Sequence, residues 1–249
     1  MESSLGERQS NPRVPVPLWL PLVGLGVGIV LASLFSAVAI VAQHASLSSA
    51  LNDPTTLAAD EVGLWVALVG SVAFASKRYG SRHLAQDFGL KIRPWPDIPL
   101  GLIIGVLCQL VVVPILYLPF EVGNSSFSRS LSQPAKNLVG VGKGGGSVVV
   151  ALIVLVGAPL IEELFFRGLL LSALRSTFRR LPQRVDIALS VLACGAIFGL
   201  AHFELLQFLG LFAVGVIFAA ITTKVERLGL SIFAHCGFNL VAFVLIAKV

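Results

Sequence analysis

Two adjacent glutamates and an arginine, Glu162, Glu163 and Arg167, interrupt a stretch that is otherwise apolar from Val148 to Leu174. Ionisable residues inside a lipid bilayer are costly and rare, and they usually face a cavity or a partner. Glu163 and Arg167 are four residues apart with the acid first, the arrangement in which a helical ion pair forms best. Glu162 lies about 100° around the helix from Glu163. We therefore expect Glu163 to be neutralised by Arg167 and Glu162 to be free for chemistry.

Pro159 lies three residues before this charged group. Proline has no backbone N–H and kinks a helix, which frees carbonyl oxygens that only protein or water can satisfy inside a membrane. The pattern predicts a site beside the kink. The simpler alternative is that Glu163 and Arg167 form a buried ion pair that only holds two helices together.

Two histidine motifs follow in later apolar runs. Phe198 and His202 are four residues apart, as are His235 and Asn239, so each pair lies on one helical face. A lone histidine at the end of a span is commonly an interface residue, but a histidine and an asparagine in mid-span both need partners. At about 1.5 Å per residue from the basic ends of the spans, His202 lies about 27 Å deep and Glu162 about 20 Å. The helix that carries His202 must tilt or end early for the residues to meet.

These side chains suit hydrolysis of a carbonyl compound. A carboxylate and a histidine that share a water molecule can deprotonate it for attack, and a second histidine and an asparagine amide can donate hydrogen bonds to the oxyanion that develops. The residues Glu162, His202, His235 and Asn239 therefore contain every part that a metal-free protease requires.

Zinc is the alternative for the same residues, because Glu162, His202 and His235 could hold the ion with water in the fourth position. The lack of an H-E-x-x-H pairing favours metal-free chemistry, so no cofactor is favoured and zinc stays open. A thiol mechanism with Cys194 or Cys236 is poorer, because apolar surroundings disfavour the reactive thiolate.

The elements that must position these residues are membrane-spanning helices. A hydrophobic content of 56% and a charged content of 12%, with a mean hydropathy of +0.90, exclude an ordinary soluble domain. We expect an all-α, polytopic membrane helix bundle of about seven transmembrane helices. Residues 1–17 would form an N-terminal cytoplasmic tail and residues 18–249 a single bundle. The expected spans are 18–42, 62–75, 100–120, 148–174, 185–201, 205–222 and 228–247, with a flexible Ser/Gly-rich connection before the fourth.

Charge predicts the orientation and the partners. Lys and Arg gather after the second, fourth and sixth expected spans, which the positive-inside rule places in the cytoplasm together with the N-terminus. The net charge of +5 is explained by these loops, so no nucleic acid is expected. The expected partners are the lipid bilayer and a membrane-associated peptide or protein substrate. The sequence does not determine the oligomeric state.

The three motifs together resemble the CPBP family, which comprises the type II CAAX prenyl endopeptidases and their bacterial relatives in bacteriocin processing and self-immunity. The motifs that carry the resemblance are Glu162-Glu163-x-x-x-Arg167, Phe198-x-x-x-His202 and His235-x-x-x-Asn239, within a catalytic region of about 148–247. The resemblance implies that Glu162 with His202 activates the water and that His235 with Asn239 forms the oxyanion hole. Glu163, Arg167 and Phe198 would be supporting residues.

The expected activity is that of an intramembrane endopeptidase in a bacterial plasma membrane, cleaving a peptide bond near the cytoplasmic side. The rival interpretation is a non-enzymatic membrane protein, either an immunity or scaffold factor or a proton-coupled carrier. A carrier would show repeat symmetry and paired broken helices, which the sequence lacks. An immunity or scaffold factor would tolerate the loss of Glu162.

Overall fold

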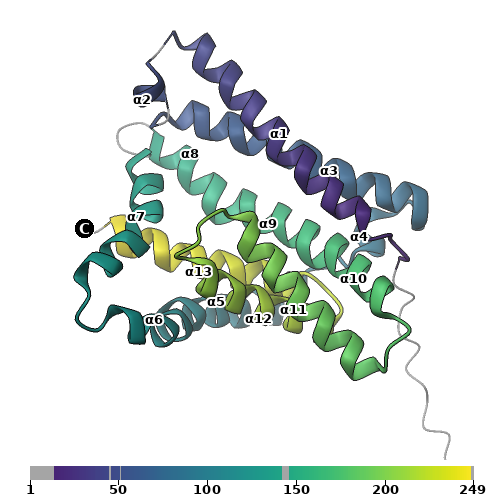
Figure 1. The fold of residues 1–249 in the computed structure, drawn as a ribbon. Coiled ribbons are helices and arrows are strands. Elements are labelled where there is room, and N and C mark those ends of the chain that lie inside the picture. The colour runs from purple at the N-terminus through teal and green to yellow at the C-terminus, as the bar shows by residue number, and fades with distance from the viewer. Residues whose placement is uncertain (1–13, 45, 51, 142–145, 248–249) are drawn as a thin grey trace, which may run out of the picture.

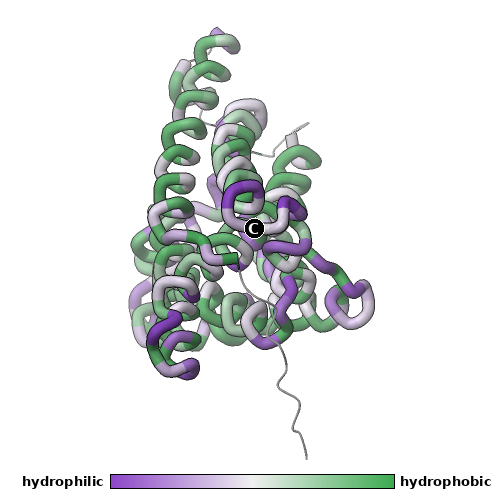
Figure 2. The backbone as a smooth tube through the Cα atoms, turned by 90° about the vertical axis from the view of Figure 1, so that its right-hand side faces the viewer, coloured by the Kyte–Doolittle hydropathy of each residue, from purple (hydrophilic) through white to green (hydrophobic). Residues whose placement is uncertain are grey.

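The computed structural model describes residues 14–44, 46–50, 52–141 and 146–247, and all regular structure in these residues is helical (Figure 1). This confirms the predicted all-α class. Within the described residues, six helices are long and apolar enough to cross a membrane, and the apolar helix at Gly229–Leu245 is shorter, in agreement with about seven spans. Figure 2 shows hydrophobic residues along most of the helices and hydrophilic ones mainly near the connections.

The spanning helices have these bounds: α1 (Trp19–Ala42), α3 (Pro54–Tyr79), a continuous rod of α5 (Pro94–Leu107), the π-helical turn η1 (Cys108–Val112) and α6 (Val113–Glu121), then α11 (Gln183–Ala201), α12 (Phe208–Val225) and α13 (Gly229–Ala247). The rod between α6 and α11 is Ser147–Phe178, and it consists of α8 (Ser147–Leu152), η3 (Ile153–Gly157), α9 (Ala158–Glu162), η4 (Glu163–Leu170) and α10 (Leu171–Phe178). Three further helices lie in the connections: α2 (Leu47–Ala50), α4 (Leu84–Asp87) and α7 (Ser125–Val141).

The rods pack as close pairs around the central rod α8–α10. Helix α1 runs along α3, α5 along α13, and α11 along α12. Small residues permit this approach: a side chain on Gly105 would collide with the backbone of Ala234, and one on Gly195 with Val216. All of η4 is buried, so the charged motif lies in the centre of the bundle.

The connection before the central rod differs from the prediction. Residues 125–141, expected as a flexible connection, form helix α7. Its Phe127 stacks on Phe120, and the carbonyl of Leu131 accepts a hydrogen bond from Gln207 at 3.0 Å. The most glycine-rich part of this connection, residues 142–145, lies outside the described residues.

The start of the described chain packs on the bundle. Val14 and Val16 belong to the expected cytoplasmic tail, yet both are buried in the main core. Residues 1–13 lie outside the described part. The residues just before the predicted division at residue 17 therefore pack against the bundle.

Most of the cationic residues that the structure describes gather at one end of the bundle. The end that holds α4 and the connections α10–α11 and α12–α13 is called the basic end (Figure 1). Its cationic residues are Lys77, Arg78, Arg82, Lys91, Arg93, Arg175, Arg179, Arg180, Arg184, Lys224 and Arg227. The opposite end holds α2, α7 and the connection α11–α12.

Candidate active site

A cavity of about 300 Å³ collects the predicted site residues. Glu162 reaches it from the last position of α9, His202 from the residue that ends α11, and His235 and Asn239 from α13. Phe198 also lines it. Residues that are as far apart as 162 and 239 in the chain therefore line one cavity. His202 lies with them, although its estimated depth in the membrane differed from that of Glu162.

Pro159 and the π-helical turn η3 shape the backbone at the start of α9. The N–H of Ala158 passes over Val154 and donates to the carbonyl of Ile153, and Pro159 has no N–H to offer. The carbonyl of Val154 is thus left without a partner in its own helix, and Asn239 donates its Nδ2 to it at 2.8 Å. This contact agrees with the expectation that the proline frees a carbonyl for another helix to satisfy.

The predicted ion pair between Glu163 and Arg167 is present. Nη1 of Arg167 lies 2.8 Å from Oε1 of Glu163, and both side chains are 0% exposed. The guanidinium lies 4.3 Å from the ring centroid of Phe198 and 5.4 Å from that of Phe218, so aromatic faces surround the buried cation. Phe198 thus supports the pair as well as lining the cavity.

Glu163 also holds a catalytic candidate, a role that its spacing from Arg167 did not suggest. Nδ1 of His235 lies 3.0 Å from the same Oε1 atom. Because a carboxylate accepts hydrogen bonds, Nδ1 is the donor, and Nε2 is the nitrogen left for other contacts. Glu163 therefore sets the orientation of the imidazole ring.

His202 is oriented in a similar way by its own helix. Its Nδ1 lies 2.8 Å from the carbonyl oxygen of Phe198, and because a carbonyl only accepts, this nitrogen carries the proton. The ring packs edge-on against Phe198, with centroids 4.7 Å apart. In the neutral ring, Nε2 then has the free lone pair that can receive a proton.

Glu162 lacks the close ion pair that holds its neighbour Glu163. Its Oε2 atom is buried without a hydrogen bond, and it lies 4.0 Å from Nε2 of His235 with the side chain 15% exposed. That separation is too long for a direct hydrogen bond and is one that a water molecule can bridge. The predicted pairing of Glu163 with Arg167 is confirmed, and the role of Glu162 in chemistry stays a prediction.

The donors do not form a compact metal site. Within the residues that the structure describes, no group of three His, Cys, Asp or Glu side chains lies close enough to hold a metal ion. The zinc alternative through Glu162, His202 and His235 would therefore require these side chains to move. Cys194 is fully buried and donates its Sγ to the carbonyl of Phe166 at 3.3 Å, which fits a packing role.

Three polar residues of the cavity were missed by the sequence analysis: Glu61, Glu204 and Gln207. Glu61 lies in α3, which begins eight residues earlier than the predicted span because Asp53 and Pro54 start the helix. Asp53 accepts a hydrogen bond from the N–H of Thr55 at 2.8 Å, and proline suits the first helical position. This capping pattern is the signal in the sequence that could have placed Glu61 on a helix.

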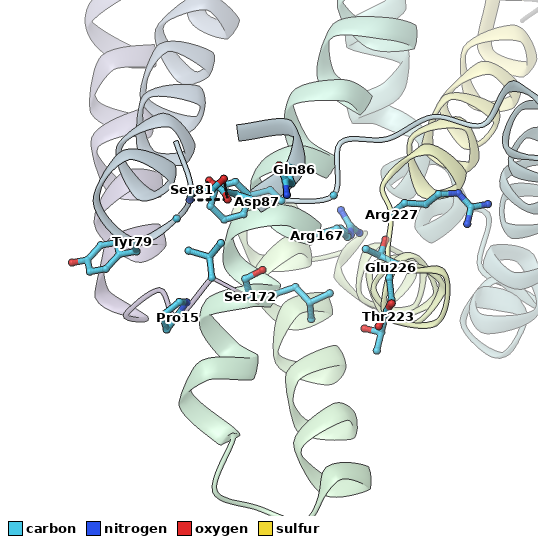
Figure 3. A pocket seen from close by; sticks show the side chains of 16 residues that line it. Pro15, Tyr79, Ser81, Gln86, Asp87, Arg167, Ser172, Thr223, Glu226 and Arg227 are labelled. Carbon is cyan, nitrogen blue, oxygen red and sulfur yellow. Dashed lines mark hydrogen bonds between the residues drawn. The ribbon is translucent and has the colours of Figure 1, made fainter. Parts of the chain in front are cut away.

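A second cavity of about 450 Å³ lies at the basic end (Figure 3). Arg167 lines it, so the buried ion pair separates the two cavities. The Arg227 side chain at its rim is paired with Asp97, and Asp87 accepts hydrogen bonds from Ser81. None of the predicted catalytic residues lines this cavity, so it is not the candidate active site.

The candidate cavity extends toward the opposite end of the bundle. Its lining includes Pro134 and Leu138 of α7 and Glu204 and Gln207 of the connection α11–α12. The basic end lies on the other side of the ion pair between Glu163 and Arg167. The first residues of α1 lie at the basic end, so the cavity extends toward the end of the bundle that lies away from them.

Residues 144–241 match the family model of the Rce1-like type II CAAX prenyl endopeptidases. All three motifs lie inside the matched residues, which confirms the resemblance to the CPBP family in this region. Comparisons with curated proteins and with solved structures gave no match. The apolar helices and the matched family of membrane endopeptidases identify an integral membrane protein.

Proposed function

We propose that this protein is a membrane-embedded endopeptidase that hydrolyses a peptide bond of a membrane-associated protein or peptide. The observation that carries the proposal is the single cavity that Glu162, His202, His235 and Asn239 line together. The match of residues 144–241 to the Rce1-like endopeptidases supports the reaction class. The contacts described above support the roles that we propose for the individual residues.

Glu162 and His202 are the proposed activators of the attacking water. The water would lie between the unpartnered Oε2 of Glu162 and Nε2 of His202, both of which can accept its proton. Its oxygen attacks the carbonyl carbon of the scissile bond as one of the two takes that proton. When the C–N bond breaks, the same proton passes to the leaving nitrogen, so that an amine and a carboxylic acid are released, and the acid then loses its remaining proton to solvent to become a carboxylate.

His235 and Asn239 are the proposed donors to the oxyanion. Asn239 uses one N–H of its amide toward Val154 and has a second one to give. His235 uses Nδ1–H toward Glu163, so its role requires a proton on Nε2 as well. Donors held in place before the reaction stabilise the oxyanion without rearrangement in the transition state, and the fixed partners provide this preorganisation.

The orientation that we propose places the basic end in the cytoplasm, as the positive-inside rule predicts. The candidate cavity then occupies the extracytoplasmic half of the bundle. A bacterial plasma membrane remains the proposed location, and the scissile bond would be reached from its outer half. This replaces the expectation of cleavage near the cytoplasmic side.

A comparison of membrane proteomes tests the function in cells. Cells that produce the wild-type protein and cells that produce Glu162→Ala at the same level are compared for membrane proteins that remain uncleaved. A new amino terminus that is present only with the wild type supports the endopeptidase. If the two proteomes show the same cleavage products, the scaffold or immunity interpretation is preferred.

A further inference from the structure

Glu61 is a carboxylate of the candidate cavity for which the reaction described above has no use. It lies near the start of α3 and lines the cavity together with Glu162. Helix α3 approaches the central rod closely at this level, because the ring of Trp65, one turn after Glu61, packs against Gly157 where any side chain would collide with it. The carboxylate is therefore held in place by rigid helices rather than by a loop.

Acidic side chains predominate among the charged residues that line the cavity, although the oxyanion role proposed for His235 would add one positive charge. Its charged lining residues are Glu61, Glu162 and Glu204, and the described residues that line it include no Lys or Arg. Among the described residues, Oε2 of Glu61 is buried and has no hydrogen-bond partner, like Oε2 of Glu162, and both side chains line this cavity. A buried carboxylate without a partner is costly, so a cationic group is the occupant that this space favours.

We propose that Glu61 determines specificity by binding a cationic group of the substrate, such as a Lys or Arg side chain or an amino terminus. The inference rests on the proposed function. Because Glu61 and Glu162 line the same cavity, a cation bound at Glu61 would also favour the ionised form of Glu162 that a general base requires.

The chain offers a matched control one residue away. Asp60 is also a carboxylate of α3, but its Oδ1 accepts a hydrogen bond from Ser36 of α1 at 2.8 Å, and it is not among the residues that line the cavity. Removing the charge of Asp60 changes the net charge of the protein as much as removing that of Glu61. Only Glu61 should affect recognition of a cation in the cavity.

A binding measurement tests the inference without any need for turnover. The probe is n-butylammonium, which resembles the end of a lysine side chain, with n-butanol as the neutral equivalent. We expect butylammonium to raise the unfolding temperature of wild type and Asp60→Asn in nanodiscs, and to lose this effect in Glu61→Gln. Equal stabilisation of Glu61→Gln, or equal effects of the two probes on the wild type, would overturn the proposal.

Cleavage of a peptide library gives the second readout and separates the two proposals. Quenched fluorescent peptides carry lysine, norleucine or glutamate at each position in turn. The wild type and Asp60→Asn should prefer lysine over norleucine at one position by about tenfold or more in kcat/KM, as a charge-assisted contact predicts. Glu61→Gln should lose this preference, and Glu61→Lys should shift it toward glutamate.

Failure of the proposed role of Glu61 and failure of the proposed endopeptidase function give different results. A wild type that cleaves peptides without preference for a cation, or a Glu61→Gln variant that keeps the preference, contradicts the role of Glu61 and leaves the endopeptidase intact. Cleavage that is equal in the wild type and in Glu162→Gln contradicts the proposed function instead.

Discussion

Glu163 and His235 are joined by a 3.0 Å contact between Oε1 and Nδ1, although they lie 72 positions apart in the chain. The same oxygen receives Arg167 at 2.8 Å. The carboxylate that pairs with Arg167 therefore also holds His235, which is a candidate donor of the oxyanion hole. A change at Arg167 should consequently affect stability and activity together.

Replacement of Arg167 tests this support. Arg167→Ala should lower the free energy of unfolding by about 3–5 kcal/mol, because it leaves Glu163 buried without its counter-ion. The measurement is denaturation of the purified protein in detergent, with Arg129→Ala of the exposed α7 surface as the control. The double variant Glu163→Leu with Arg167→Met should be less destabilised than Arg167→Ala, since no buried charge remains. Unchanged stability of Arg167→Ala would contradict the pairing.

Replacement of Asn239 tests the oxyanion hole. Asn239→Ala removes the proposed donor and should lower kcat about a hundredfold or more, with a smaller effect on KM. The loss of the contact to Val154 should also cost some stability, which a thermal unfolding curve measures separately. A variant that is destabilised but turns over at the normal rate would show that Asn239 only holds the proline-kinked helix.

Removal of metal ions tests the choice between the two hydrolytic mechanisms. We expect activity to survive exhaustive chelation and elemental analysis to find less than one zinc per chain. Zinc at one equivalent, lost together with activity in His202→Ala or His235→Ala, would instead establish the site formed by Glu162, His202 and His235.

Asp87 at the basic end predicts a pH dependence of stability. Burial raises the pKa of its carboxyl, but hydrogen bonds from Ser76 and Ser81 outweigh burial and hold the pKa below the ordinary value of 3.8. Its stabilising contribution is present above that ordinary value and is lost as the pH falls through the lower folded-state pKa. The unfolding temperatures of wild type and Asp87→Asn should therefore converge below about pH 4. A gap that stays constant from pH 6 to pH 3 would contradict this.

Local rules predicted much of the fold and of the site. Hydropathy located the spans, helical spacing predicted the pair of Glu163 and Arg167, and the one-turn spacing in each histidine motif placed those residues on common faces. Each of these relationships depends on neighbours within a few residues. The contact between Glu163 and His235 depends on how two helices pack, which spacing within one helix does not determine.

The remaining differences have identifiable causes. Helix α7 was missed because its Ser-rich composition concealed the helical spacing of Phe127, Leu131 and Leu138. Glu61 was missed because acidic residues at the start of α3 moved the predicted span forward to residue 62. Periodicity alone gave no sign of the π-helical turns on both sides of α9.

The central claim is that Glu162 is the base that activates water. Glu162→Gln keeps the size of the side chain and removes the proton acceptor, so peptide cleavage in nanodiscs should fall to the background while unfolding temperature and peptide binding are retained. The measurement is kcat for one cleaved peptide, in the wild type and in Glu162→Gln purified in parallel. Cleavage by Glu162→Gln at the wild-type rate would contradict the account.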